Sequence, residues 1–489
     1  MDRYFLLKGT FAVLLLVGAG NLGAHQAPKY KVGIQPDGSI VAPDNTILTP
    51  AGTQVEFIGR PTAIAIRPDQ QTAACSNTGV SGGTGNVVIL DLNTGQALQQ
   101  FAPYSGAYNS IAGLSYSPDG SKLYFCDDNA QIDVMNVASD GTVSNADTIY
   151  LPLDGYRGTP AVLAFSSDSN TLYVAMNFDN TLGVINVQTQ QLVSQIPVGN
   201  APWGGVVQGN IAFVSNQGGR PANPTDFTDL SANTPIVANP ESAAPITGTV
   251  SVVDLVKQKE IEEIEVGIEP TAMVMNGKYL FVANTNSDTI SVIDTDTRKV
   301  VKTISIKPFR NAPFGSQPNS LVFTTPNQLV VSLGTNNAFA VYDWEGPTAP
   351  VTLLGLIPTA WHPGSIAFES NRNRIDVANI KGVGSLGPVA TVGPDPATNK
   401  TGHYTKSYLG SASLIPIPDQ QQLAAYTRQV VKNNGWRKHE HASMAGANRQ
   451  MKAKAIPDQI GDPSLISHVF YIIKENRTYD SGRYYRGRR

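Results

Sequence analysis

Short hydrophobic runs separated by polar turns recur along most of the chain, and this pattern predicts β-strands. The clearest unit begins at Pro270 with the apolar segment 271–274. It continues with the strand-like sequences YLFVAN, TISVID and KVVKTI, which end at Asn284, Asp294 and Ile304. The abundance of Val, Ile, Thr and Tyr suits a pleated, half-buried surface. The unit therefore predicts four consecutive short strands.

The unit is repeated along the chain. A period of roughly 40 to 50 residues is typical of four-stranded propeller blades. One such sheet leaves two apolar faces exposed, and stacking sheets around an axis buries both. Regular spacing of this kind favours a closed ring over a β-sandwich or an open solenoid, and we predict an all-β, seven-bladed β-propeller over residues 25–418. Six further copies begin near Pro61, Ser110, Pro160, Pro202, Pro318 and Pro363, with successive starts 42 to 68 residues apart.

Two segments fall outside the period. Residues 217–246 lie within the longest step and are rich in Pro, Asn, Ala and Thr, so we expect a long loop insertion on one face. Residues 31–57 precede the first copy, and we expect them to supply a strand that closes the ring against the last blade.

The turns have a recognisable chemistry. The Ser-Pro-Asp-Gly turn that starts at Ser117 places Pro where φ is already fixed and Gly where a positive φ is needed. Asn at the ends of the VAN-type strands suits turns, because Asn tolerates a left-handed backbone. A turn role also suffices for the acids Asp69, Asp119 and Asp168.

The N-terminus has the form of an export signal. Arg3 and Lys8 flank a short apolar run, residues 11–17, and small residues lead to Ala24. We predict a signal peptide over 1–24, because the run is shorter than the about 20 residues that span a membrane. Later stretches are no better suited to spanning a bilayer, so we expect an exported protein, periplasmic or extracellular, without a transmembrane span.

Composition narrows the partners. The 489 residues are 15% charged with a net charge of −3, so no global electrostatic case exists for nucleic acid. The two cysteines, Cys75 and Cys126, fall at similar places in consecutive repeats. A disulfide needs Cα atoms within about 7 Å, which equivalent strands of adjacent blades exceed, so we favour two buried free thiols.

On these repeats, residues 55–420 resemble the YVTN family of β-propellers, which is in turn similar to lactonase-type propellers. The resemblance implies a seven-bladed ring in a secreted or surface-located protein and no single activity. Three residues at blade starts, where propellers line their channel or upper face, are binding candidates, although packing explains each of them too: Trp203, Trp361 and His362.

The pattern changes after Pro418. Asp419 can cap a helix that carries Leu423, Tyr426 and Val430 on one face, and we assign 419–465 to this helix and a polar linker. Residues 466–489 then begin with an apolar strand that leads into the sequence ENRTYD.

This last segment resembles the first core strand of the phosphoesterase family of the alkaline-phosphatase superfamily. The resemblance implies a remnant of an α/β phosphoesterase domain in which Glu475 and Asn476 would help bind a divalent metal. From periodicity alone they read as turn residues. The family's Ser or Thr nucleophile and its further Asp and His ligands have no counterpart here, so we name no catalytic residue and expect no metal to bind firmly. A frameshift or premature stop after Asp480 would explain the basic ending.

Two other groups carry less chemistry. His439-Glu440-His441 lies in the polar linker without further ligands at structural-site spacing. The glycine-rich stretch 381–388 lacks the terminal Lys-Ser or Lys-Thr of a phosphate-binding loop, and we expect a flexible loop between blades.

These observations leave three alternative hypotheses for the function. The first is a binding or scaffold module of a propeller–phosphoesterase protein, a monomer without hydrolase activity in this chain, that binds an unidentified ligand or protein on one face. The second is a lactonase-like hydrolase acting in the central channel, which needs convergent acids or histidines. The third is one piece of a phosphatase whose remainder is encoded separately.

Overall fold

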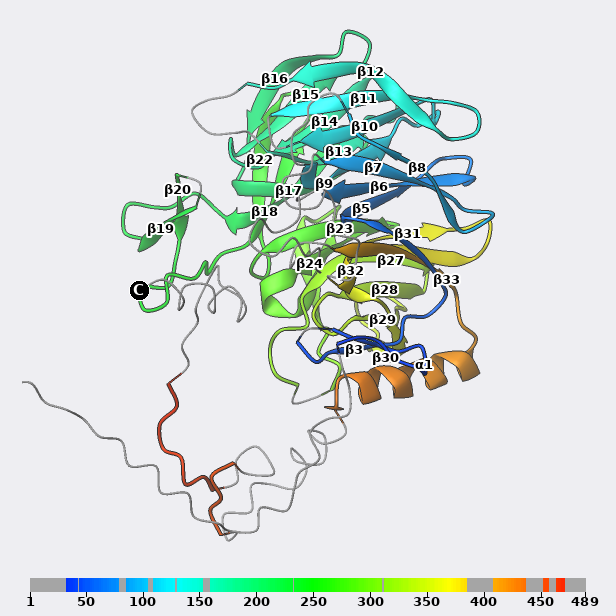
Figure 1. Ribbon diagram of the computed structural model, residues 1–489. Helices are drawn as coiled ribbons and strands as arrows, with labels where there is room; N and C mark the ends of the chain where they lie inside the picture. Colours follow the sequence, from blue (N-terminus) through cyan, green and yellow to red (C-terminus); the bar gives the residue numbers. More distant parts are fainter. Residues whose placement is uncertain are drawn as a thin grey trace, which may run out of the picture.

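The computed structural model describes most of the chain as β-structure arranged in seven four-stranded antiparallel sheets (Figure 1). The first strands of these sheets contact one another in a closed order, β5–β9–β13–β17–β23–β27–β31 and back to β5. The seven sheets are therefore the blades of a β-propeller, which confirms the predicted architecture. The description covers residues 32–470 except 43, 79–84, 104–108, 128–129, 153–158, 232, 310–311, 385–407, 437–451 and 457–462.

Each innermost strand begins within two residues of a predicted repeat start, because the blade-opening Pro or Ser stands at or just after its first residue. From the channel outward, blade 1 comprises β5 (Arg60–Ile66), β6 (Thr72–Thr78), β7 (Asn86–Asp91) and β8 (Gln96–Phe101). Blade 2 comprises β9 (Asn109–Tyr116), β10 (Lys122–Asp127), β11 (Gln131–Val137) and β12 (Val143–Tyr150), and blade 3 comprises β13 (Pro160–Phe165), β14 (Thr171–Met176), β15 (Thr181–Asn186) and β16 (Gln191–Pro197). Blade 4 comprises β17 (Asn200–Gln208), β18 (Ile211–Gly219), β21 (Thr249–Asp254) and β22 (Lys259–Glu265), and blade 5 comprises β23 (Pro270–Asn276), β24 (Tyr279–Asn284), β25 (Thr289–Asp294) and β26 (Lys299–Ser305), with a 3-10 turn, η1 (Thr285–Ser287), between β24 and β25. Blade 6 comprises β27 (Pro318–Thr325), β28 (Gln328–Leu333), β29 (Ala338–Asp343) and β30 (Thr352–Pro358).

Blade 7 is assembled from both ends of the ring. It contains β31 (Trp361–Glu369), β32 (Arg374–Gly384) and β33 (Leu409–Pro416), and its outer strand is β4 (Thr53–Ile58). β4 pairs antiparallel with β33, with Leu409 opposite Ile58 and Leu414 opposite Thr53. Hydrogen bonds between segments more than 350 residues apart therefore close the ring.

The closure is reinforced by buried charges at the face opposite the innermost strand starts. Arg374 contacts Asp376 at 2.7 Å (Nε to Oδ1) and Glu369 at 3.1 Å (Nη2 to Oε2). Its Nη1 also donates to the carbonyl of Leu92 in blade 1 at 3.3 Å. Burial raises the pKa of Asp376 to about 6, against the pull of the neighbouring arginine.

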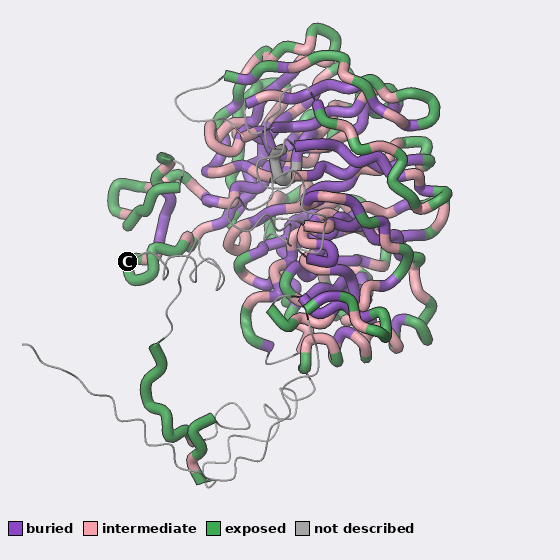
Figure 2. The backbone as a smooth tube through the Cα atoms, viewed as in Figure 1, coloured by how far each residue is buried: buried purple, intermediate pink, exposed green. Residues whose placement is uncertain are grey.

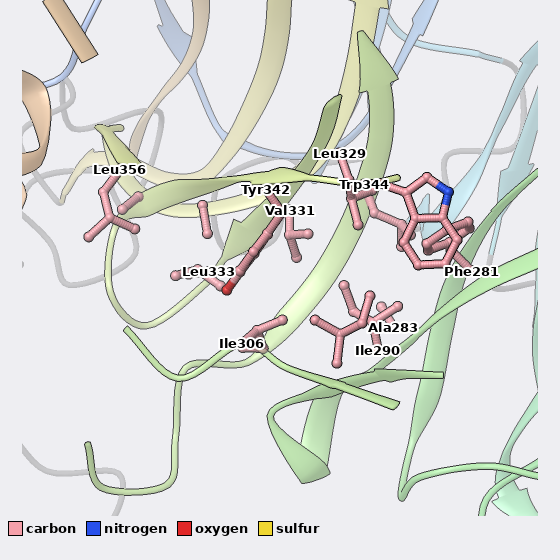
Figure 3. Packing of buried hydrophobic residues seen from close by; sticks show 14 of the residues in the cluster. Phe281, Ala283, Ile290, Ile306, Leu329, Val331, Leu333, Tyr342, Trp344 and Leu356 are labelled. Atoms are coloured by element: carbon pink, nitrogen blue, oxygen red, sulfur yellow. The ribbon is translucent and has the colours of Figure 1, made fainter. Parts of the chain in front are cut away.

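Hydrophobic side chains fill the spaces between blades. Between blades 5 and 6, Phe281 meets the ring of Trp344 edge-on with centroids 4.8 Å apart (Figure 3). The ring of Phe323 lies edge-on to Phe281 as well, with centroids 4.9 Å apart. Such edge-to-face contacts add to the burial of both rings. Figure 2 shows the same division for the whole ring, with buried residues along the blades and exposed residues at the turns and outer strands.

A buried Asn at the end of the second strand recurs in four blades. The Nδ2 of Asn284 donates to Thr289 and Ser291 on the next strand, both at 3.0 Å. This differs from the expected turn role, since Asn284 has an extended backbone with φ −100°. The amide instead satisfies hydroxyls that would be costly to bury alone. The equivalent residues are Asn77, Asn216 and Asn379.

The insertion 217–246 is more ordered than the expected loop. It contains a hairpin of β19 (Thr228–Ser231) and β20 (Thr234–Val237), which stands beside the ring in Figure 1. β-branched residues favour these strands, and Ile236 and Val237 are buried. The long insertion predicted here is present, and part of it is a β-hairpin rather than a loop.

Two further elements cover the ring. A small sheet of β1 (Gly33–Ile34), β2 (Ile40–Val41) and β3 (Ile47–Leu48) packs its Ile40 and Leu48 against Val383 of blade 7. Helix α1 (Gln420–Asn433) lies along β30, as Figure 1 shows, with Leu423 and Val430 buried. The predicted cap is confirmed, because Asp419 accepts a hydrogen bond from the N–H of Gln422 at 2.7 Å.

Both cysteines, Cys75 and Cys126, are buried and free, as expected. Burial raises the pKa of each thiol, so neither is activated. The helices of the described part are all too short or too polar to cross a membrane. The predicted signal peptide, 1–24, lies outside the described residues.

Candidate ligand site at the channel mouth

The innermost strands of all seven blades begin at the same face of the ring, which we call the mouth face. Arg60, Pro270 and Trp361 mark this face as the first residues of β5, β23 and β31. Second strands end there, because each runs antiparallel to its inner neighbour, and the β19–β20 insertion follows one of them. Loops that leave a rigid scaffold at one face are the usual place for binding residues.

A cavity of about 160 Å³ lies where the inner strands converge. Six of the seven blades contribute to its walls, so the ring as a whole forms it. Its lining consists of Thr62, Ala63, Val162, Trp203, Thr271, Ala272, Asn319, Ser320, Gly364, Ser365 and Ile380.

Most lining residues directly follow the Pro that opens a blade. Several of their polar groups join neighbouring blades: the Ser320 hydroxyl accepts from the N–H of Ile366 at 3.1 Å. The Nδ2 of Asn319 donates to the carbonyl of Pro363 at 3.0 Å. The inner strands are thereby held in register, and the cavity has hydroxyl, amide, aliphatic and indole groups.

The residue before the blade-opening Pro has a left-handed backbone in four consecutive blades. These residues are Ala201, Glu269, Gln317 and His362, with φ between 51° and 59°. A left-handed conformation costs a non-glycine residue roughly 1–2 kcal/mol and persists only where the surroundings hold it. Such strain concentrates at binding and catalytic sites more often than elsewhere.

Side chains from the preceding blade hold these strained residues. Asn337 Oδ1 accepts from the N–H of His362 at 2.8 Å, and Asn180 Oδ1 accepts from the N–H of Ala201 at 2.8 Å. Asp288, which is fully buried, accepts from the N–H of Gln317 at 3.1 Å and from two preceding amides. The mouth face is therefore fixed by contacts between blades.

Basic and aromatic side chains form the rim between blades 7 and 1. The Lys381 ammonium lies 4.7 Å from the centroid of the Trp361 ring, and the Arg60 guanidinium lies 5.1 Å from that of Tyr408. His362 lies in the same region. Burial, together with the positive charges of Lys381 and Arg60, lowers the pKa of His362 to about 4, so its imidazole is neutral at pH 7.

The three binding candidates that the sequence suggested lie at two different places in the structure. Trp203 lines the cavity, whereas Trp361 and His362 are adjacent at the rim. Trp361 also packs against the core of the small β1–β3 sheet, so it has a structural role as well.

The metal candidates Glu475 and Asn476 lie outside the described residues, as do His439, Glu440 and His441. The described part of the predicted apolar strand, 466–470, forms no strand, and its Phe470 is 91% exposed. A strand needs a paired neighbour, and none of the described strands lies beside it. Within the described ranges, no group of three His, Cys, Asp or Glu side chains could hold a metal ion.

The glycine-rich stretch also differs from the expected loop, because Lys381–Gly384 belong to β32. Gly382 and Gly384 have φ of 52° and 93°, which lets the strand continue through an irregular register. Gly382 packs so closely that an added Cβ would lie 2.3 Å from the carbonyl oxygen of Leu409. This local geometry places Lys381 beside Trp361.

The turn acids take the structural role predicted for them. Asp119 accepts from the Ser117 hydroxyl at 2.6 Å and from the N–H of Ser121 at 3.0 Å. Asp168 accepts from Ser166 and Asn170 in the same way, and these bonds lower its pKa to about 2. Both lie at turns after innermost strands, on the face opposite the mouth.

Several residues of this site lie in no motif that marks them in the sequence. Arg60 and Lys381 are single charges in strands that look ordinary, and only the closure of blade 7 beside blade 1 brings them together. The hydroxyl lining could have been found from position, since Thr62, Thr271 and Ser365 each follow a blade-opening Pro by one or two residues.

Comparison with known proteins agrees with the class of fold. Neither a family model nor a curated protein matches the chain. Among solved structures, it is similar to a chain of Kuenenia stuttgartiensis hydrazine synthase, with a TM-score of 0.51 and 17% sequence identity. The match covers 66% of this chain and 93% of the other. At this identity the similarity supports the propeller-like fold alone.

Proposed function

We propose that the propeller is a binding module that takes its ligand at the mouth face. The observation that supports this most is the cavity of about 160 Å³ at the convergence of the inner strands. Drug-sized ligands fill sites of roughly 300–1,000 Å³. The cavity therefore suits a small molecule, or a single side chain or functional group of a larger partner.

The lining favours binding over hydrolysis in the channel. A lactonase-like reaction needs convergent carboxylates or imidazoles around a metal or a water. The lining side chains are instead hydroxyls, an amide, aliphatic groups and Trp203. Such groups orient a ligand by hydrogen bonds and stacking without activating a nucleophile.

A cavity-filling variant tests the proposal. Val162 lines the cavity, and Val162→Phe would fill much of it, whereas Val193→Phe adds the same ring to an outer strand where Val193 is 59% exposed. A fragment library would be screened by thermal shift against the wild-type chain from His25 onward. We expect hits that Val162→Phe abolishes and Val193→Phe retains. Hits unaffected by Val162→Phe would contradict a site in the cavity.

We also propose that the module is exported and that it acts together with a phosphoesterase. The YVTN-like repeats and the segment that leads to Glu475 and Asn476 resemble propeller–phosphoesterase proteins, and the residues up to Ala24 resemble a signal peptide. We infer an exported binding or scaffold module whose ligand is related to phosphate-ester hydrolysis by a phosphoesterase. Cell fractionation with N-terminal sequencing tests export: a periplasmic or extracellular chain starting at His25 is expected, and a cytoplasmic chain that retains Met1 would contradict it.

Hydrolysis itself is tested with a generic phosphomonoester and added divalent metals. The sequence offers no counterpart of the family's nucleophile, so we expect no turnover from this chain. Metal-dependent turnover that Glu475→Ala abolishes would show that the C-terminal segment contributes a complete site, and a pure binding role would then be wrong.

A further inference from the structure

The rim between blades 7 and 1 holds two cations, Arg60 and Lys381, that pair with no carboxylate among the residues that the structure describes. None of the ion pairs in the described part of the chain includes Arg60 or Lys381. The Nε of Arg60 is buried and makes no hydrogen bond within those residues. Each cation instead faces an aromatic ring, Tyr408 or Trp361.

Three chain segments build this rim. Trp361 lies opposite Gly382 in the β31–β32 pair, so Lys381 stands beside it. The N–H of Gly59 donates to the carbonyl of Tyr408 at 3.0 Å, which fixes Arg60 near the start of β33. The β31–β32 pair and the Gly59–Tyr408 hydrogen bond are both parts of the ring closure. The rim is therefore preformed rather than assembled by surface side chains in solvent.

The aromatic contacts alone do not account for two cations here. A cation–π contact at a partly exposed position stabilises a charge less than a charge-assisted hydrogen bond does. Like charges in one region oppose each other: after burial, which is the larger cause, the positive charges of Lys381 and Arg60 both add to the lowering of the pKa of His362. An anion placed among these groups would relieve that repulsion.

We propose that Arg60 and Lys381 bind the carboxylate or phosphate group of a small ligand at the rim. The guanidinium presents planar N–H donors that suit two oxygens, and the ammonium acts as a second point of charge. The ligand's body enters the cavity, whose wall includes Ile380, the neighbour of Lys381, and Gly364, which lies two residues after His362. This inference rests on the proposed binding function and specifies its ligand class.

The first experiment titrates the wild-type chain with inorganic phosphate, benzoate and neutral benzamide at constant ionic strength. Binding is followed by calorimetry and by the NMR signal of His362, which His362→Gln assigns. We expect phosphate or benzoate to bind and to raise the pKa of His362, because a negative charge favours the imidazolium. Phosphate alone would identify an oxyanion site, and benzoate would identify an organic acid whose ring enters the cavity. Benzamide binding as tightly as benzoate would overturn the proposal.

Single substitutions test which cations bind the anion. Arg60→Gln and Lys381→Gln should each weaken anion binding about tenfold or more, in line with one lost charge-assisted hydrogen bond. Lys299→Gln removes an exposed cation from the outer strand β26 and should leave binding unchanged. Melting temperatures identify any variant that fails to fold, and the other variant then carries the test.

The outcomes separate this inference from the proposed function. Anion binding unaffected by both rim variants would overturn the rim site. If Val162→Phe still abolished fragment binding, the cavity would remain a binding site for neutral ligands. No binding of any anion to the wild type would overturn the rim site as well.

Discussion

Asn337 accepts a hydrogen bond at 2.8 Å from the backbone N–H of His362, the strained second residue of β31 in blade 7. Asn337 itself has a left-handed backbone, with φ 51°, and is buried. One side chain therefore holds a turn of blade 6 and the entry of blade 7 together. The same relationship links Asn180 to Ala201 and Asp288 to Gln317, so the geometry of the mouth face depends on contacts across blade boundaries.

Replacing this acceptor should destabilise the ring. We expect Asn337→Ala to lower the free energy of unfolding by about 1–3 kcal/mol, since a partly buried N–H loses its partner and Ala disfavours a left-handed backbone. Asn337→Gly loses the same bond but accepts the backbone, so it should lose less. Urea unfolding measures all three proteins. Equal stability of Asn337→Ala and wild type would show that the bond does not hold the blade.

Two adjacent glycines of β17 test how closely the inner strands pack. A Cβ on Gly204 would lie 2.5 Å from the carbonyl oxygen of Thr271 in blade 5, whereas a Cβ on Gly205 would meet nothing within 4 Å. We expect Gly204→Ala to cost about 1–3 kcal/mol, because the strands would have to separate. Gly205→Ala should change stability by less than about 0.5 kcal/mol. Thermal unfolding compares them, and equal effects would contradict the close approach of blades 4 and 5.

The histidine at the rim gives a pH dependence with a definite sign. The pKa of His362 is lowered to about 4, while an unfolded chain has a histidine pKa of about 6.5. As the pH falls below 6.5, this histidine becomes protonated in the unfolded chain while it stays neutral in the folded protein. The free energy of unfolding therefore decreases down to about pH 4, by at most about 3 kcal/mol.

Asp376 acts in the opposite sense over part of this range, because its pKa is raised to about 6 and protonation favours the folded state. Comparison with His362→Gln removes that contribution. We expect the stability of wild type relative to His362→Gln to fall between pH 7 and pH 4 in urea unfolding. A difference that does not change with pH would show that His362 titrates normally.

Helix α1 should stabilise the ring, because it packs on blade 6. Leu423 is buried against Gly355, and the Thr427 hydroxyl accepts from the N–H of Leu356 at 2.9 Å. We expect Leu423→Ala to cost about 2–4 kcal/mol. Leu354→Ala, at a position that is 47% exposed, should cost less than about 1 kcal/mol. Similar losses in both variants would mean that the helix is not docked in solution.

Much of the ring could be predicted from the sequence because its repeat is regular. Pro or Ser near each inner strand start, the turn acids Asp119 and Asp168, and the Asp419 cap are local signals, and local signals suffice for them. The hairpin within 217–246 was missed because the segment is rich in Pro, Asn, Ala and Thr, although β20 carries the β-branched residues Thr234, Ile236 and Val237. The role of Asn284 was also missed, since its hydroxyl partners lie on another strand.

The site was harder to predict for a physical reason. Arg60, His362 and Lys381 are close only because β4 and β5 follow one another while β4 completes blade 7, so residues more than 300 positions apart meet at the ring closure. The left-handed backbone before the blade-opening Pro of blades 4 to 7 was equally hidden, because the residue before Pro ordinarily prefers an extended conformation. Contacts between blades impose it.

The most direct test of the central claim is a crystal structure of the wild-type chain soaked with a fragment that binds in the thermal-shift screen. A binding module of the kind proposed should show the fragment in the cavity at the mouth face, in contact with Trp203 and Thr271. A fragment bound only at outer strands or turns of the opposite face would contradict the account, because the convergence of the inner strands would then not be the binding site.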